Sequence, residues 1–177
     1  MTTDPGTGSE ALVRLPVQAP RSNVAPATAP GGPGTSALVA RLAAEHGATW
    51  VDEASIAAWS AQGGDRVVLF AGDAVRFPEG QDVAVVLPEL RRCASRPFEI
   101  AVVPRECEEA VARRYGSNRW PTLLFLRDGE YVTALAGMHD WEVFLQAVEA
   151  ALRLPTSRAP TIGIPVVSAV RADASCH

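Results

Sequence analysis

Lysine is absent from this 177-residue chain, and all 16 of its basic residues are arginine. With 20 acidic residues the formal net charge is −4, so the chain lacks the positive excess that binds nucleic acid or anionic lipid. No apolar run approaches the roughly 20 residues that span a bilayer, and no charged-then-apolar leader opens the sequence. We therefore expect no nucleic-acid partner, no membrane partner and no export.

Cysteine is scarce, and the three cysteines, Cys93, Cys107 and Cys176, form no C-x-x-C pair. Isolated cysteines in odd number favour a reducing compartment, which predicts a cytoplasmic protein with free thiols that act as small hydrophobes. The sequence also has no glycine-rich phosphate loop, metal-ligand spacing or nucleophile–base pair. We expect no metal, no cofactor and no enzyme activity.

Proline and glycine divide the chain into three parts. Residues 1–35 contain six prolines and five glycines and carry little charge, which predicts a disordered Pro/Gly/Ala-rich arm. Residues 36–154 carry the apolar periodicity of a folded domain. Residues 155–177 form a C-terminal tail whose docking place the sequence does not fix.

The expected elements of the domain alternate between helix and strand before an antiparallel hairpin. Continuous apolar runs predict strands buried on both faces, and Asp128-Gly129 is a strong hairpin turn signal. Alternation predicts parallel strands joined by crossover helices, hence an α/β fold with a mixed central sheet. The expected elements are helix 36–46, strand 48–51, a short helix after 52, strand 66–71, helix 81–95 with Pro88 inside, strand 98–103, helix 107–115, strands 122–126 and 131–136, and helix 140–153.

The second half of the domain resembles thioredoxin. The resemblance rests on Arg114-Tyr115-Gly116, Trp120-Pro121-Thr122-Leu123-Leu124, Asp128-Gly129-Glu130 and Gly137. It implies a three-layer α/β/α architecture in which Pro121 follows a cis peptide bond, and Pro88 matches the proline that kinks the helix after thioredoxin's active site. Only proline adopts the cis bond at modest cost.

The redox chemistry of thioredoxin is missing from this sequence. The two positions that carry the cysteines in thioredoxin are Gly80 and Val83, and the position of its buried acid is Leu69. Without a thiolate, disulfide exchange by that route is impossible. The scaffold therefore points to binding in place of catalysis.

A cysteine-free thioredoxin-like domain with an N-terminal helix, the Ala136-Gly137 and Trp141 pattern and a Gly-Ile-Pro tail resembles the hydrogenase maturation accessory family HyaE/HupG/HoxO. The resemblance implies a cytoplasmic, non-catalytic chaperone that binds the small-subunit precursor of an [NiFe] hydrogenase and its twin-arginine signal peptide. Other hydrogenase accessory proteins are further possible partners.

The candidate peptide-binding residues are Trp120, Pro121, Asp73, Glu79 and Asp82. Backbone beside a cis-proline can pair with an extended peptide, and the three acids would form a rim for an Arg-Arg motif. The alternative interpretation is that Pro121 shapes the fold, Trp120 packs on the core and the acids are solvated.

Three further hypotheses remain open. The acidic cluster Glu106, Glu108 and Glu109 at a helix start is explained by the helix dipole alone. An atypical thiol redox protein would use Cys93 or Cys107. A structural subunit of a hydrogenase assembly complex would act through its arm and tail.

Overall fold

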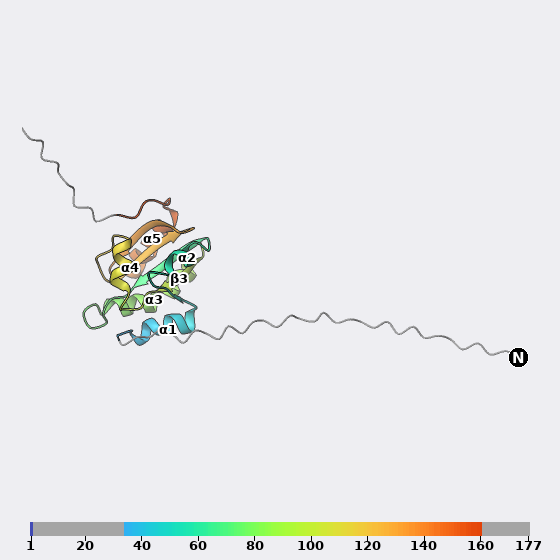
Figure 1. Ribbon diagram of the computed structural model, residues 1–177, viewed down its shortest axis with the longest axis horizontal. Helices are drawn as coiled ribbons and strands as arrows, with labels where there is room; N and C mark the ends of the chain where they lie inside the picture. Colours follow the sequence, from blue (N-terminus) through green and yellow to red (C-terminus); the bar gives the residue numbers. More distant parts are fainter. Residues whose placement is uncertain (2–33, 161–177) are drawn as a thin grey trace, which may run out of the picture.

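The computed structural model describes Met1 and residues 34–160 of the chain (Figure 1). Most of the predicted arm 1–35 and of the tail 155–177, with Cys176, lies outside these residues. Within 34–160 no helix is both long enough and apolar enough to cross a membrane.

Helix α1 (Ala37–His46) begins and ends where its sequence signals predict. The Ser36 hydroxyl accepts a hydrogen bond from the Leu38 N–H at 3.2 Å, satisfying one free donor of the first turn. Gly47 ends the helix in the left-handed region at φ 72°, a conformation that glycine adopts without a Cβ clash. Val39 and Leu42, one turn apart, are the buried face of the helix.

Five strands form one mixed sheet in the order β1-β3-β2-β4-β5. The strands β1, β2 and β3 are parallel to one another, β4 pairs antiparallel with β2, and β5 pairs antiparallel with β4. Their bounds are β1 Thr49–Trp50, β2 Asp65–Phe70, β3 Phe98–Val102, β4 Thr122–Arg127 and β5 Glu130–Ala136. The hairpin between β4 and β5 turns at Asp128 and Gly129, both with positive φ, as the Asp-Gly pair predicts.

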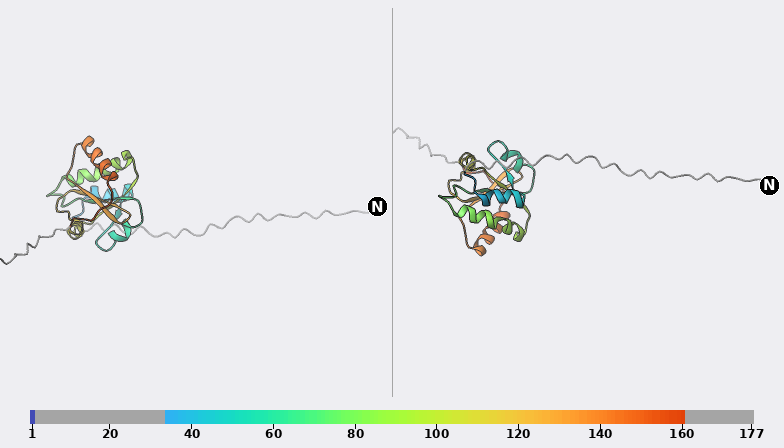
Figure 2. Two further views of the ribbon diagram at one scale, coloured as in Figure 1. Left: turned by 90° about the horizontal axis from the view of Figure 1, so that it is seen from above. Right: turned by 90° about the horizontal axis from the view of Figure 1, so that it is seen from below.

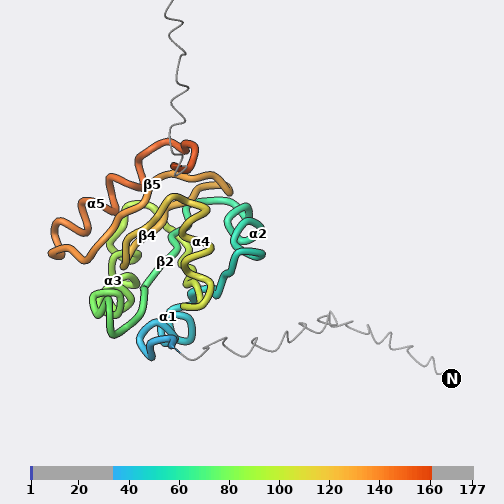
Figure 3. The backbone as a smooth tube through the Cα atoms, turned by 60° about the vertical axis from the view of Figure 1, so that its left-hand side comes forward, coloured from blue at the N-terminus to red at the C-terminus, as the bar shows by residue number. Residues whose placement is uncertain are grey.

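Alternate residues of the central strands enter two separate cores. Val67 and Leu69 of β2 pack in a cluster with α1, α3 (Glu79–Cys93) and α5 (Trp141–Arg153). Val68 and Phe70 pack on the other face with α2 (Ile56–Ser60) and α4 (Glu108–Arg114). Figures 2 and 3 show α3 and α5 on one side of the strands and α2 on the other. The three-layer α/β/α fold with a mixed sheet is thereby confirmed, and its architecture is thioredoxin-like.

Helix α3 starts at Glu79, two residues before the predicted start. Pro78 takes the cap position with φ −58°, a value that leads directly into a helix. Asp82 lies in the first turn of the helix. Pro88 lies inside the helix, as the sequence requires.

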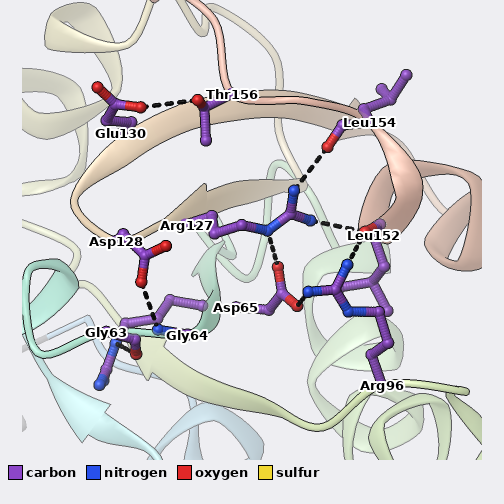
Figure 4. Close-up of polar contacts among 11 residues, drawn as sticks. Gly63, Gly64, Asp65, Arg96, Arg127, Asp128, Glu130, Leu152, Leu154 and Thr156 are labelled. Atoms are coloured by element: carbon purple, nitrogen blue, oxygen red, sulfur yellow. Dashed lines mark hydrogen bonds and ion pairs between the residues drawn. The ribbon is translucent and has the colours of Figure 1, made fainter.

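The amino end of β2 is fixed by an ion-pair cluster around the buried carboxylate of Asp65 (Figure 4). Asp65 Oδ1 lies 2.5 Å from Arg127 Nε, and Asp65 Oδ2 lies 2.9 Å from Arg96 Nη2. Both guanidinium groups also donate to the carbonyl of Leu152 at the end of α5. The cluster therefore joins the sheet to the last helix.

The first residues of the tail lie against the body of the domain. The Ser157 N–H donates to the Tyr131 carbonyl at 2.6 Å, which adds one antiparallel bridge to β5. Further on, the Pro160 carbonyl would lie 2.3 Å from a Cβ at Gly116, so only glycine fits there. Residues 155–160 thus run from the sheet edge to the end of α4.

Candidate functional site

The peptide bond between Trp120 and Pro121 is cis, as the resemblance to thioredoxin implies. The bend is held on both sides, because Thr122 Oγ1 donates to the Arg119 carbonyl at 2.7 Å and the Gly137 N–H donates to the Pro121 carbonyl at 2.8 Å. In contrast, the backbone N–H and C=O of Trp120 form no hydrogen bond with any described residue. They remain available to an extended ligand.

The loop after β2 folds back onto Trp120. The rings of Phe77 and Trp120 lie 5.9 Å apart between centroids. Gly72, at φ 81°, approaches both: a Cβ there would lie 2.8 Å from the Phe77 ring and 2.9 Å from Trp120 Cβ. An aromatic pair therefore stands at the carboxyl end of β2, where thioredoxins carry their active site.

The positions of the thioredoxin cysteines are closed by packing. A Cβ at Gly80 would lie only 1.9 Å from the Ala71 carbonyl oxygen, so no side chain fits without moving the backbone. Val83, three residues later, is 1% exposed, and so is Leu69 in the strand beneath. The redox site has been replaced by close contact between α3 and β2.

The carboxylate of Glu108 is buried against the start of the loop that follows β2. Glu108 is 1% exposed, and its Oε1 accepts from the Ala71 N–H at 2.7 Å while its Oε2 accepts from the Gly72 N–H at 3.0 Å. Arg105 lies 3.8 Å away. Burial raises the pKa of Glu108 to about 7, against the opposing effects of the two N–H donors and of Arg105.

Trp120 contributes to the same environment. Its indole N–H is buried and meets no acceptor at hydrogen-bond geometry among the described residues, although it approaches Glu108 closely enough to lower the pKa of that carboxyl slightly.

From the sequence, Glu108 was explained by the helix dipole alone. The sequence did not predict that this carboxylate is buried and accepts hydrogen bonds from the Ala71 and Gly72 N–H groups. Nothing in the local pattern distinguishes Glu108 from its exposed neighbour Glu109.

Two adjoining clefts, of about 360 and about 480 Å³, lie beside the Trp120 side chain. Both are lined by Arg76, Phe77, Asn118 and Trp120. The first cleft extends to Arg105, Glu109, Arg113 and Ser117, and the second to Arg119, Ala136 and Gly137. We call the two together the Trp120 cleft; its lining contains four arginines and one acid.

The three acids predicted to form a rim do not line the Trp120 cleft. Asp73 Oδ1 accepts from the backbone N–H of Val75 and of Arg76, and these bonds lower its pKa. Glu79 and Asp82 are exposed in the first turn of α3. Of the other two predicted residues, Trp120 lines the cleft, whereas Pro121 is buried and adjoins the cleft only through its peptide bond to Trp120. The three acids lie on the neighbouring helix start and loop.

The two described cysteines lie away from this site. Cys93 is exposed at the last residue of α3, Cys107 precedes α4, and both are free thiols. Burial, followed by the nearby Glu106, raises the pKa of Cys107, which disfavours the reactive thiolate. Neither side chain lines the Trp120 cleft.

Fold and site together define a thioredoxin-like protein whose redox positions are occupied by packing residues. Residues 38–144 match the family model described as hydrogenase-1 expression protein HyaE. A hydrogenase expression/formation protein HoxO from Cupriavidus necator is 54% identical over 142 residues, which cover 79% of this chain and 88% of that protein. The chain therefore belongs to the HyaE family of hydrogenase expression proteins.

A second curated relative supports this assignment, and a similar protein has been crystallised. A hydrogenase expression/formation protein HupG from Bradyrhizobium diazoefficiens is 35% identical over 126 residues, covering 69% of this chain and 85% of that protein. The crystal structure of a HupG from Rhodopseudomonas palustris has 37% sequence identity and a TM-score of 0.43, and the match covers 59% of this chain and 94% of that chain.

Proposed function

We propose that this protein is a non-catalytic accessory protein in hydrogenase maturation, a cytoplasmic chaperone that binds the small-subunit precursor together with its twin-arginine signal peptide. Membership of the HyaE family supports the hydrogenase connection. The observation that carries the binding role is the Trp120 cleft beside a cis-proline, in a scaffold whose redox positions are closed.

Binding would use the backbone of Trp120 and the face of its ring. The unpaired N–H and C=O of Trp120 can form strand-like hydrogen bonds with an extended segment of the precursor. The Trp120–Phe77 pair supplies apolar contact area that is fixed in place before binding. Asp73, Glu79 and Asp82 would attract the arginines of the signal peptide next to the cleft.

The first test is binding of purified precursor, with and without its signal peptide, to the full chain by calorimetry. We expect Trp120→Ala to weaken binding by about tenfold or more, the effect of removing a buried aromatic contact. Trp141→Ala removes a tryptophan that is 40% exposed and does not line the cleft, and it is the matched control. Equal loss in both variants, or no binding by the wild type, would reject the proposal.

A second variant tests the acidic residues. A triple variant combines Asp73→Asn, Glu79→Gln and Asp82→Asn and removes three negative charges. Asparagine at position 73 keeps an oxygen that can accept from the backbone N–H groups of the turn. We expect weaker binding only of the precursor that retains its signal peptide, and only at low salt, because exposed charges are screened. The control replaces the exposed acids Glu53, Glu99 and Glu142 with glutamine.

A further inference from the structure

The Trp120 cleft differs in charge from the molecule as a whole. The chain has a net charge of −4, yet four of its arginines line this cleft with a single acid. That acid, Glu109, is already engaged, because its Oε1 lies 3.6 Å from Arg105 Nη2. The remaining arginines of the cleft therefore dominate its charge.

Three of these arginines form no ion pair with residues 34–160, although Asp73 lies close enough to Arg76 to interact with its charge. Arg113 and Arg119 are exposed, and their side chains form no ion pair or hydrogen bond between residues 34 and 160. Arg76 lies over the Phe77 ring at 5.5 Å, a contact that leaves its N–H donors free. Unpaired guanidinium groups are well suited to carboxylates, which they bind through two parallel hydrogen bonds.

The arginines are distributed along the whole cleft. Arg113 lines the first cleft, Arg119 lines the second, and Arg76 lines both. A compact anion in either cleft would meet two of these three arginines. An extended chain with acidic side chains can meet all three and reach the free backbone groups of Trp120.

We infer that the Trp120 cleft binds an acidic, extended peptide segment of the partner, with carboxylates facing Arg76, Arg113 and Arg119 and an apolar side chain on Trp120. This inference rests on the proposed function and deepens it, since it names the chemistry of the bound segment. A twin-arginine motif is repelled by this cleft, so it occupies the acidic surface at the start of α3 while a different, acidic part of the precursor occupies the cleft.

The test uses a capped synthetic peptide of about ten residues in which glutamate alternates with valine, long enough at about 3.3 Å per residue to follow the cleft. The comparison peptide has glutamine at each glutamate position. Calorimetry with the full chain should show the glutamate peptide binding about tenfold tighter at low salt, and high salt should reduce that ratio.

The variant Arg113→Gln with Arg119→Gln should weaken binding of the glutamate peptide by about tenfold and leave the glutamine peptide unchanged. Its control, Arg41→Gln with Arg153→Gln, makes the same change in charge at exposed residues that do not line the cleft. Equal binding of the two peptides, or equal loss in variant and control, would overturn the inference. Thermal melting of each variant verifies folding.

The precursor itself separates the two proposals. If the precursor binds equally to the wild type and to the Arg113/Arg119 variant, the inference that the cleft binds an acidic segment is refuted and the proposed function stands. If the precursor does not bind at all while the glutamate peptide binds through these arginines, the proposed function is refuted and the charge selectivity of the cleft stands.

Discussion

The two ends of strand β2 each hold a buried carboxylate, and the surroundings of the two differ. At the amino end, Asp65 contacts two guanidinium groups within 2.9 Å, and those groups also bind the end of α5. At the carboxyl end, Glu108 accepts only from two backbone N–H groups at close range, and its nearest guanidinium is 3.8 Å away.

The difference separates a structural end of the sheet from the end that carries the candidate functional site. Asp65 is matched by positive charge at close range, so its contacts join β2, β4 and α5. Glu108 has a single guanidinium nearby, that of Arg105 at 3.8 Å, and Arg76, Arg113 and Arg119 line the Trp120 cleft. Arginine side chains are thus concentrated along the Trp120 cleft, and the pKa of the nearby buried Glu108 carboxyl is raised.

The largest expected effect is at the structural end. Asp65→Asn leaves Arg127 and Arg96 without their carboxylate, and we expect the free energy of unfolding to fall by about 3 kcal/mol, as for other buried pairs that lose one partner. Denaturant unfolding at pH 8 measures it. Glu99→Gln, at an exposed position of β3, should change stability by less than about 0.5 kcal/mol. An equally mild effect at Asp65 would show that the cluster does not stabilise the fold.

Glu108 should make stability depend on pH in the opposite direction from an ion-paired acid. Its pKa is about 7 in the folded protein against 4.5 for the free group, so the folded state binds more protons between these values. Stability contributed by the protonated group is fully present below pH 4.5 and is lost as the pH rises through 7. The loss is on the order of 3 kcal/mol.

Unfolding midpoints measured from pH 4.5 to 8 check this prediction. Glu108→Gln keeps an oxygen acceptor for the Ala71 and Gly72 N–H groups and should flatten the curve. Glu109→Gln, at the exposed neighbour, should leave the curve as in the wild type. A wild-type curve without this decline would place the pKa of Glu108 near its ordinary value.

Gly80→Ala tests whether the redox positions are truly closed. The new Cβ would meet the Ala71 carbonyl oxygen at 1.9 Å, and we expect a loss of about 2 kcal/mol from the forced backbone shift. Val85→Ala, at an exposed position of the same helix, is the control. Thermal unfolding that leaves Gly80→Ala as stable as the control would mean that the loop can open to admit a side chain.

The smallest expected effect is at Arg105. Arg105→Gln removes a guanidinium 3.8 Å from Glu108, and because that charge favours the ionised form, the pKa of Glu108 should rise further. Stability at pH 8 should fall by about 0.5 kcal/mol. The decline in stability with pH should shift to higher pH; a shift to lower pH would contradict the assigned role of Arg105.

The elements and the fold could be predicted because their signals are local. Ser36 and Gly47 bound α1, Asp128-Gly129 turns the hairpin, and apolar runs mark the strands, since each depends on backbone preferences of a few neighbouring residues. The absence of cysteine at positions 80 and 83 could also be read directly from the sequence. Trp120 and Pro121 could be singled out for the same reason, as adjacent residues at a recognisable bend.

Only the tertiary structure decided the charge of the candidate site. Arg76, Arg113 and Arg119 line one cleft because three separate segments converge there: the loop after β2, the end of α4 and the loop before β4. Glu108 and Glu109 are adjacent in sequence, yet the turn of α4 buries one and exposes the other. The sequence by itself determined the scaffold and the absence of cysteine at its two redox positions. Packing between distant segments determined which charged side chains line the cleft, because the electrostatic environment of a group depends on distance in space.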